Sequence, residues 1–220
     1  MVAVRLDALL AGRIAALGET QKSAIAKHRV EGPVRLGFAG LDGDFQADKR
    51  HHGGPDKAIH HYPFDHYPRW RESAPDRRRL AAPGAFGENL STLGLLEGAT
   101  CIGDRFRIGG ALIEISQGRQ PCNTQARFLE WNALPALMVK ERRCGWYARV
   151  IEEGLVAAGD MLTLVDRPLP QWSVARVFGL LIGGDYKADP QALVALETMD
   201  LLHDGWRKRA RELYGRFTIG

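Results

Sequence analysis

The chain has 220 residues, of which 45% are hydrophobic, 25% charged and 8% aromatic. This is the composition of a soluble globular protein, and it excludes fibrous, collagen-like and wholly disordered chains. The 25 glycines and 11 prolines exceed what a helical bundle tolerates, so we expect many turns and mainly β structure. The formal charge of +4 arises from 30 basic and 26 acidic side chains, a nearly balanced surface that gives little support to a nucleic-acid partner.

The sequence also argues against a secreted or membrane-spanning protein. It has no uncharged apolar run of about 18 residues. Charged residues at Arg5, Asp7 and Arg13 interrupt the apolar start before a signal-peptide core could form. We therefore expect a cytoplasmic protein with no membrane partner.

The first third of the chain predicts strands followed by a polar loop. Short apolar runs separated by glycines in residues 1–40 are typical of strands and turns. Residues 41–70 are dense in Gly, Asp and His, and their Gly-Gly-Pro-Asp centre marks a turn. We expect a site loop here, followed by a short helix around Pro63 to Arg71. The arginine-rich stretch from Arg69 to Arg79 is typical of a solvated loop.

The middle of the chain predicts a small barrel or sandwich, and parallel βαβ architecture is disfavoured. Short alternating or β-branched runs bounded by glycine turns occupy residues 87–95, 97–117 and 154–166. Between Cys122 and Gly154 apolar residues recur three and four positions apart, which predicts helical segments over the β structure. Pro135 should start or break one of these helices.

The composition changes after residue 166. A Pro-Leu-Pro linker signal precedes three helix-like segments, at residues 173–182, 189–199 and 203–214. Ser173 and Asp189 occupy N-cap positions, and Pro190 stands at the favoured first helical position. The predicted fold is mainly β (α+β), with a barrel-like domain over residues 1–166, peripheral helices, and a three-helix subdomain over residues 167–220.

Five of the seven histidines cluster around the Gly-Gly-Pro-Asp turn, without the H-x-x-x-H or H-E-x-x-H spacing of a helical zinc site. Three interpretations stay open: a direct metal site, a polar surface loop with packed imidazoles, and an anion or cofactor pocket. The pocket has a mechanism, because the Gly53-Gly54 turn can expose consecutive N–H groups while Lys49, Arg50 and Lys57 supply positive charge.

The three cysteines, Cys101, Cys122 and Cys144, are an odd number without a C-x-x-C pair, which fits neither a disulfide framework nor a closed zinc finger. Cys122 follows a predicted strand in a Gly- and Pro-shaped loop beside Arg119. This setting favours a reactive thiolate, although a structural role stays open. We expect Cys101 to be buried as a small hydrophobic residue and Cys144 to pack from a helix.

Two weaker signals complete the candidates. Glu88 and Asn89, in Phe-Gly-Glu-Asn-Leu, either cap a turn and strand or contact a ligand. The last helix carries five basic residues from Arg207 to Arg216, which is typical of a solvated face, with nucleic-acid binding as the minor alternative.

Taken together and in order, these segments closely resemble the MOSC domain, and within it the YiiM-like branch. The resemblance rests on G-L-D-G-D-x-Q-A-D-x-R-H-H-G-G-P-D-K-A-x-H-H-Y-P, then G-A-F-G-E-N-L-S-T-x-G-L, I-G-D-R-x-x-I-G and the Q-P-C loop. The W-S-V-A-R-V segment and the later helices are similar to the "3-alpha" domain that follows MOSC in that branch. The resemblance covers roughly residues 28–215.

The resemblance implies a β-barrel-like fold whose pocket binds the molybdenum cofactor, a pterin with a phosphate and a dithiolene that holds molybdenum. It implies that Cys122 is the catalytic residue, which either ligates the molybdenum or carries sulfur. Seven further positions that match the family motifs are candidate cofactor contacts: His52, Gly53, Gly54, Lys57, Asn89, Arg119 and Gln120. Phe45 and the basic residues Arg77 to Arg79 depart from the family pattern and affect the expected shape of the substrate site.

The function implied by the resemblance is an oxidoreductase, a molybdenum-cofactor-dependent reductase of N-hydroxylated compounds such as hydroxylaminopurine-type base analogues. A separate reductase would supply electrons, because the chain shows no flavin, haem or iron–sulfur motif. Pyridoxal phosphate is not expected, and no oligomeric state is predicted. Two alternatives stay open: a sulfur-carrier or cofactor-delivery protein with a persulfide on Cys122, and a nucleic-acid-binding module with steeply salt-dependent binding.

Overall fold

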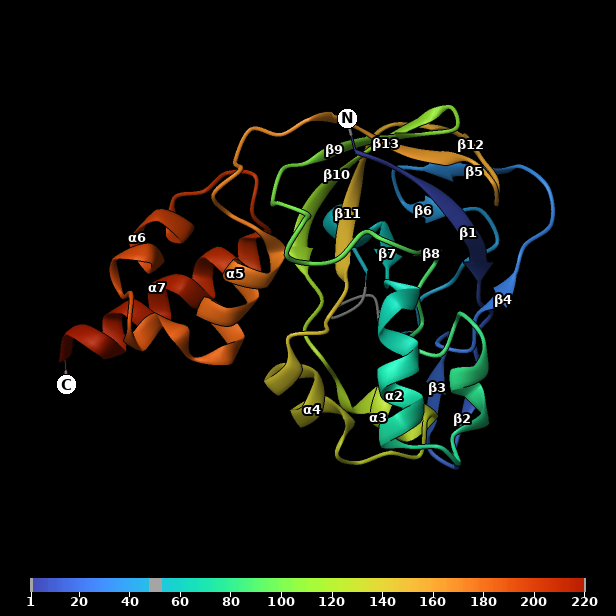
Figure 1. Ribbon diagram of the computed structural model, residues 1–220, viewed down its shortest axis with the longest axis horizontal. Coiled ribbons are helices and arrows are strands. Elements are labelled where there is room, and N and C mark those ends of the chain that lie inside the picture. The colour runs from blue at the N-terminus through green and yellow to red at the C-terminus, as the bar shows by residue number, and fades with distance from the viewer. Residues whose placement is uncertain (1, 48–52, 220) are drawn as a thin grey trace.

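The computed structural model describes residues 2–47 and 53–219, with side chains as far as Arg216. Its centre is a β-barrel of seven strands (Figure 1), with bounds β1 (Ala3–Ala11), β7 (Ile59–His61), β8 (Leu90–Thr92), β9 (Arg105–Ile108), β10 (Ala111–Gly118), β11 (Trp146–Glu152) and β13 (Met161–Asp166). The strands pair in the order β13-β9-β10-β11-β7-β8-β1, and β13 also pairs with β1, so the sheet closes on itself. This confirms the mainly β, barrel-like fold.

The barrel is antiparallel except at one junction. Strands β7 and β8 run parallel and meet through His61 and Leu90. On the long β10–β11 pair, Ile115 lies opposite Ala148, and both side chains are buried in the barrel. Inward-facing residues fill the interior of a barrel of this size, so it is a packed core and the site must lie outside it.

Shorter strands pair around the barrel. The hairpin of β2 (Ala15–Leu17) and β3 (Gln21–Ser23) stands apart as a two-stranded sheet. The short β4 (His28–Arg29) pairs with the end of β1. A three-stranded sheet is formed by β5 (Val34–Gly37), β6 (Gly40–Leu41) and β12 (Gly154–Val156). The strands and turns predicted for the first 40 residues are therefore confirmed.

Short helices in the described residues connect the barrel strands, with bounds η1 (Pro55–Lys57), η2 (Phe64–His66), α2 (Tyr67–Ser73), η3 (Arg78–Ala81), α3 (Asn123–Phe128) and α4 (Leu134–Glu141). Helix α2 confirms the predicted helix after the histidine-rich loop, and Pro135 lies in the first turn of α4, as predicted. A hydrophobic cluster separate from the main core lies under these helices. It is rich in aromatic residues, and the Tyr62 and Phe86 rings stack in it with their centroids 4.1 Å apart.

The C-terminal segment folds into helices packed on one side of the barrel (Figure 1), with bounds α5 (Val174–Phe178), a π-helical turn η4 (Gly179–Gly183), η5 (Asp185–Lys187), α6 (Gln191–Glu197) and α7 (Asp204–Ile219). Ser173 caps α5 by accepting a hydrogen bond from the Arg176 N–H, as predicted. At α6 the N-cap residue is Pro190, one position later than predicted, although the Asp189 carboxylate still accepts the Ala192 N–H at 3.3 Å.

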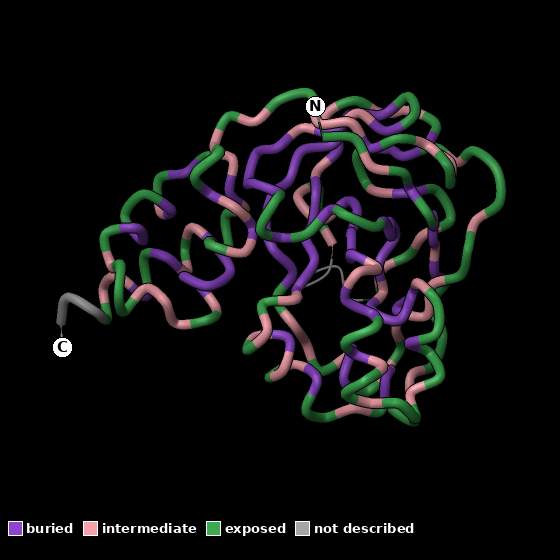
Figure 2. The backbone as a smooth tube through the Cα atoms, in the orientation of Figure 1, coloured by how far each residue is buried: buried purple, intermediate pink, exposed green. Residues whose placement is uncertain are grey.

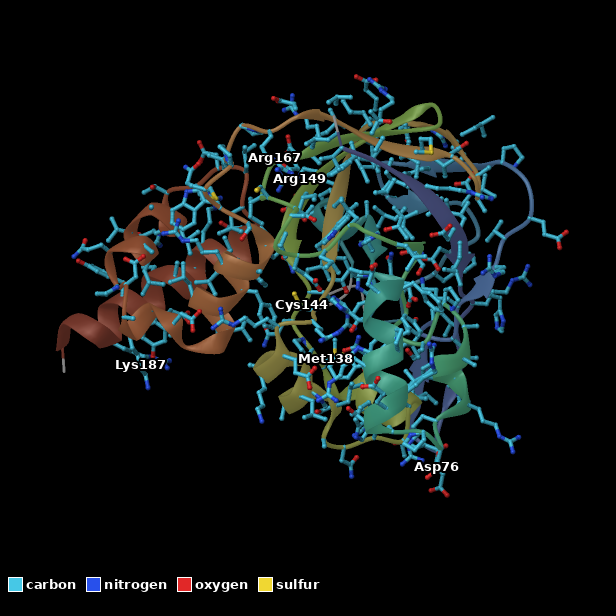
Figure 3. All side chains as sticks on the ribbon, viewed as in Figure 1. Asp76, Met138, Cys144, Arg149, Arg167 and Lys187 are labelled. Atoms are coloured by element: carbon cyan, nitrogen blue, oxygen red, sulfur yellow. The ribbon has the colours of Figure 1, made fainter. Side chains whose placement is uncertain are left out.

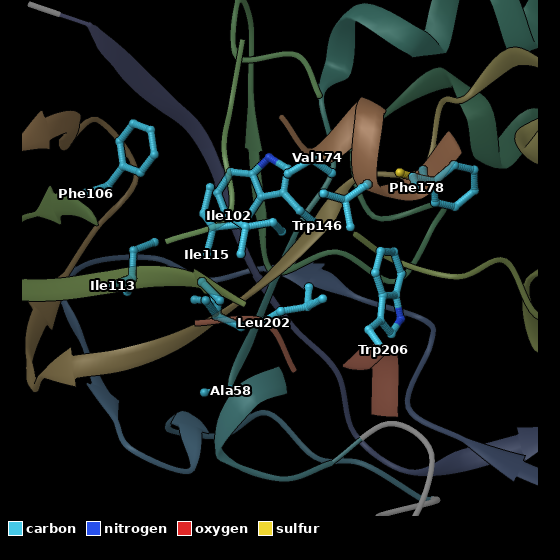
Figure 4. Close-up of a cluster of buried hydrophobic side chains, with 14 of the residues drawn as sticks. Ala58, Ile102, Phe106, Ile113, Ile115, Trp146, Val174, Phe178, Leu202 and Trp206 are labelled. Carbon is cyan, nitrogen blue, oxygen red and sulfur yellow. The ribbon is translucent and has the colours of Figure 1, made fainter. Parts of the chain in front are cut away.

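The helices share a hydrophobic core with the barrel. Figure 4 shows barrel residues such as Ile115 and Trp146 together with Val174 and Trp206 from the C-terminal helices. In Figure 2 buried stretches occur both along the barrel strands and on the C-terminal helices. The linker between them is fixed by Arg167 (Figure 3), whose Nε donates to Asp104 Oδ1 at 2.9 Å. The domain boundary at residues 166 and 167 stays a prediction.

One segment was predicted wrongly. The helical pattern expected up to Gly154 ends at α4, and residues 146–152 form β11, a strand paired on both sides. In this segment Trp146, Ala148 and Val150 alternate with outward residues, and that period of two matches a strand. Cys144 is fully buried, but in the loop before β11 and not on a helix.

Among the residues that the structure describes, every helix is too short or too polar to cross a lipid bilayer.

Candidate cofactor cleft

A cleft opens beside the barrel, between the β2–β3 hairpin and the outer face of β7 and β11. It contains about 690 Å³ of space not filled by protein atoms, a volume that includes the solvent at its open mouth. Its described lining includes Phe45, Lys57, His60, Arg119 and Tyr147. Residues far apart in the sequence therefore converge on one concave surface.

Arg119 links this cleft to Cys122. The strand β10 ends at Gly118, and the chain then turns so that Cys122 becomes the N-cap residue of α3. The guanidinium of Arg119 donates to Cys122 Sγ at 3.6 Å and to the Gln120 carbonyl oxygen at 3.2 Å. Arg119 is only 4% exposed, whereas Cys122 is half-buried. A buried positive charge thus lies against an accessible thiol, and this stabilises a thiolate.

Burial disfavours the charge of Arg119, but the neighbouring Tyr147 and Cys122 side chains outweigh it and raise the pKa of the guanidinium. Within the described part of the chain, Arg119 Nε is buried without a hydrogen-bond partner. Native proteins seldom leave such a donor unpaired, and in this cleft the Nε–H is available to donate a hydrogen bond to a ligand.

Tyr147 and His60 form the wall next to Arg119. Their rings lie 4.9 Å apart, and Lys57 Nζ lies 6.0 Å from the centroid of the Tyr147 ring. Burial, followed by the charge of Arg119, lowers the pKa of His60 well below its ordinary value, so the imidazole is neutral at pH 7. Burial raises the pKa of Tyr147, against the opposing effect of Arg119, and keeps its hydroxyl protonated. Among the described lining residues, the cationic groups are therefore Lys22, Lys57, Arg119 and Lys27, the last of which pairs with Asp44.

A hydrogen-bonded network forms the other wall. Asn89 accepts the His60 backbone N–H at 3.1 Å, and its amide nitrogen donates to Asp44 Oδ2 at 2.9 Å. Asp44 Oδ1 in turn pairs with Lys27 Nζ and accepts the Gly12 N–H at 2.7 Å. Burial lowers the pKa of Lys27, although Asp44 acts in the opposite direction. Asn89 therefore joins β7, β1 and the loop before residue 48 at the edge of the cleft.

The predicted cofactor contacts are not all brought together. Lys57, Asn89 and Arg119 line the cleft, and Cys122 adjoins it through Arg119. Gln120 is exposed and contributes its carbonyl oxygen to Arg119. Gly53 and Gly54 do not belong to the described lining, and His52 lies outside the described residues. The roles assigned to all of them stay predictions.

Several lining residues were missed by sequence reasoning. Lys27 and Tyr147 stand in apolar segments with no local signal, and only the folded chain brings them to the cleft. Asp44 belongs to the quoted G-L-D-G-D motif, so the motif itself could have identified it. Glu88, in contrast, is fully buried and accepts the Gly84 N–H at 2.7 Å, the Phe86 N–H and the Tyr67 hydroxyl, which is the cap role.

The other predicted sites are accounted for by packing. Cys101 is 3% exposed and Cys144 fully buried, as expected of small hydrophobic residues. Across residues 2–47 and 53–219, no three His, Cys, Asp or Glu side chains are grouped so that they could hold a metal ion. In α7, Arg207 pairs with Asp204 at 3.0 Å and Arg211 with Glu197 at 2.7 Å, which favours the solvated face over a nucleic-acid surface.

Comparison with known proteins identifies the family. The family model for the MOSC domain matches residues 48–163. Protein YiiM of Escherichia coli is 45% identical over 156 residues, which are 71% of this chain and 70% of that protein. A protein named "Reductase" from Gibberella moniliformis is 39% identical over 213 residues, or 95% of this chain, which spans only 38% of that longer protein.

Solved structures agree with the sequence matches. The crystal structure of YiiM from Geobacillus stearothermophilus superposes with a TM-score of 0.80 at 29% identity, covering 95% of this chain and 98% of that one. YiiM from Escherichia coli gives a TM-score of 0.79 at 29% identity, covering all of this chain and 96% of that one. The barrel, the cleft motifs and these matches together show that the chain belongs to the MOSC domain family and is a homologue of YiiM.

Proposed function

We propose that this protein binds the molybdenum cofactor in the cleft and reduces N-hydroxylated compounds, such as hydroxylaminopurine-type base analogues. The observation that carries the proposal is the contact between the buried Arg119 guanidinium and Cys122 Sγ, 3.6 Å apart, at the edge of a cleft that Lys57 also lines. Membership of the MOSC family and the name "Reductase" of one relative support it.

The chemistry of the available groups fits this cofactor. A thiolate is a soft ligand suited to molybdenum, and Cys122 supplies one beside a fixed positive charge. Lys57 and Arg119 provide the charged donors that a phosphate requires. The unpaired Arg119 Nε, within the described residues, offers a further donor toward the ligand.

When bound, the cofactor would supply two-electron redox chemistry at its metal. Reduction of an N-hydroxylated compound breaks one N–O bond, consumes two electrons and two protons, and releases an amine and water. The residues of the chain itself would orient the cofactor and hold it in place. Arg119 would keep Cys122 in the thiolate form, Lys57 would bind the anionic part, and the neutral His60 would add no charge beside it. Electrons would come from a separate reductase.

The activity can be tested with an N-hydroxylated purine and an artificial electron donor. We expect turnover by the wild-type protein from a molybdate-supplied host, and loss of about a thousandfold or more in Cys122→Ala, because the proposed metal ligand is gone. Cys101→Ala is the matched control, since Cys101 is a buried thiol outside the cleft, and it should retain activity. Equal turnover by Cys122→Ala and wild type would contradict the catalytic role of this thiol.

The alternative is a sulfur carrier with a persulfide on Cys122. One observation favours it: Cys122 is half-buried and accessible at the start of α3, but is not part of the described cleft lining. Intact-mass measurement separates the two. A gain of about 32 Da on Cys122 in native protein without pterin would support the carrier, whereas bound pterin and an unmodified thiol would support the reductase.

A further inference from the structure

Lys57 lines the cleft and lies at the end of a single helical turn. It is the last residue of the 3-10 turn η1, whose backbone hydrogen bonds, within the described residues, run from Lys57 N–H to the Gly54 carbonyl and from Ala58 N–H to the Pro55 carbonyl. A single turn of this kind does not hold one geometry by itself. Contacts from outside η1 must therefore hold the backbone turn that carries Lys57.

Arg149 supplies such contacts. It lies on β11 (Figure 3), and its guanidinium reaches three acceptors in three different parts of the molecule. Nε donates to Asp56 Oδ1 at 2.7 Å, in η1 and next to Lys57 in the chain. One terminal nitrogen donates to Glu114 Oε1 on β10 at 2.9 Å, and the other to the Leu201 carbonyl oxygen at 3.0 Å. The side chain is only 18% exposed, so these bonds are shielded from water.

The third acceptor belongs to the turn between α6 and α7. The same turn meets the barrel again, because the His203 N–H donates to the Ser116 carbonyl at 3.0 Å. Ser116 Oγ is itself within hydrogen-bonding distance of the Asp56 carbonyl oxygen. Leu202 and Ala58, which directly follows η1, belong to one buried cluster (Figure 4). The C-terminal helices and η1 thus share their contacts with the barrel wall.

We propose that Arg149 is a positioning residue that sets the place of Lys57, and that the C-terminal helices complete this end of the cleft through it. The proposal rests on the proposed function in one respect, that Lys57 binds the anionic part of the ligand. Only a planar guanidinium can serve three acceptors in one plane, so a lysine at this position cannot replace it. The helices are then part of the binding device and not an appended module.

The experiment compares Arg149→Met, Arg149→Lys and Asp56→Asn with wild type. Arg105→Met is the matched control, because Arg105 pairs with the same Glu114 carboxylate, at 2.8 Å through Oε2, but touches neither η1 nor Leu201. Asp56→Asn keeps the size of a partly exposed side chain and should fold even where Arg149→Met does not. Thermal unfolding of every variant identifies any that fail to fold.

Two properties are measured on each folded variant. The first is local order in protein from a molybdate-starved host: deuterium exchange of the peptides that contain residues 55–58 and 199–204, and the rate of reductive methylation of Lys57. The second is the molybdenum and pterin content of protein from a molybdate-supplied host.

In Arg149→Met, Arg149→Lys and Asp56→Asn we expect faster exchange in residues 55–58 and methylation of Lys57 accelerated by about tenfold, with a similar loss of retained cofactor. Exchange in 199–204 should rise in the two Arg149 variants alone, and Arg105→Met should match wild type throughout. Unchanged exchange and methylation in Arg149→Met and Asp56→Asn, or rescue by lysine, would overturn the positioning role. Wild-type protein without molybdenum and pterin would instead contradict the proposed function, whatever Lys57 does.

Discussion

Burial separates the three thiols of this chain. Cys101 and Cys144 lie in the core, and burial, reinforced by Asp104 and Glu97 respectively, raises the pKa of each above its ordinary value. Cys122 is half-buried and contacts the Arg119 guanidinium. Since the thiolate is the nucleophile, only one of the three is prepared for chemistry.

Iodoacetamide should therefore label the thiols unequally. In native protein from a molybdate-starved host at pH 8, we expect Cys122 to react faster than Cys101 and Cys144 by on the order of a hundredfold, measured by peptide mass spectrometry. Arg119→Met should slow Cys122 alone. Labelling in guanidinium chloride, where all three should react alike, is the control. A native Cys144 that reacts as fast as Cys122 would refute this account of the thiols.

Buried histidines predict how stability depends on pH. Burial, followed by the charge of His66, lowers the pKa of His61 from 6.5 to about 3, while the His61 ring stacks on Trp146 and contacts Thr92 at 2.9 Å. The unfolded state binds a proton below pH 6.5 that the folded state refuses down to about pH 3. This contribution to stability is therefore complete above pH 6.5 and falls as the pH falls through that window.

His61→Gln should flatten this dependence. In urea unfolding at pH 7, 6 and 5, the free energy of unfolding of wild type should fall by up to about 1.4 kcal/mol per pH unit for each such histidine. In the variant the slope should be smaller by the contribution of one histidine. His28→Gln changes an exposed histidine and should leave the slope as it is. An identical slope in wild type and His61→Gln would show that His61 titrates normally.

At the scale of elements, the junction between β7 and β11 depends on a glycine. Gly145 has φ +67°, and a Cβ added there would lie 2.4 Å from the His61 carbonyl oxygen. Gly159 also has positive φ, of +99°, but a Cβ there would meet nothing within 4 Å. A side chain at Gly159 would therefore meet backbone strain alone, whereas one at Gly145 would meet both backbone strain and a steric clash.

Alanine at these two positions should have unequal costs. Gly159→Ala should destabilise by about 1 kcal/mol, from positive φ alone. Gly145→Ala should cost more than about 3 kcal/mol, because β7 and β11 must also move apart. Denaturant unfolding monitored by circular dichroism measures both. Equal costs would mean that the close approach at Gly145 relaxes freely.

The strands and helices also show which parts of the fold can be predicted from sequence patterns. Glycine-bounded alternating runs identified the barrel strands, and cap residues such as Ser173 identified the C-terminal helices, because both signals are local. At β11 the alternation of Trp146, Ala148 and Val150 is also present, but the apolar spacing of the surrounding segment favours a helix, and the pairing of the strand with β10 and β7 shows which period is the right one. The cleft shows the limit too, since the motif residues Lys57, Asn89 and Arg119 meet there with Lys27 and Tyr147, which had no motif to mark them.

For the whole molecule, the continuous core predicts cooperative unfolding. Trp206 of α7 is 5% exposed, and a Cβ added to Gly118 of β10 would lie 3.0 Å from its ring. Two units that share such contacts lose stability together. We expect tryptophan fluorescence and far-ultraviolet circular dichroism to report one urea transition. Trp206→Ala should lower the free energy of unfolding by about 3–5 kcal/mol, and both signals should report the same decrease. Two separate transitions would show that the helices are an independent domain.

If the cleft binds the molybdenum cofactor beside Cys122, the purified protein should contain that cofactor. Protein from a molybdate-supplied host would be analysed for molybdenum by mass spectrometry and for pterin by fluorescence after oxidation, with Cys122→Ser in parallel. We expect molybdenum and pterin in similar amounts in wild type and a large loss of molybdenum in Cys122→Ser. Wild-type protein that lacks both, and is as empty as the variant, would contradict cofactor binding in this cleft.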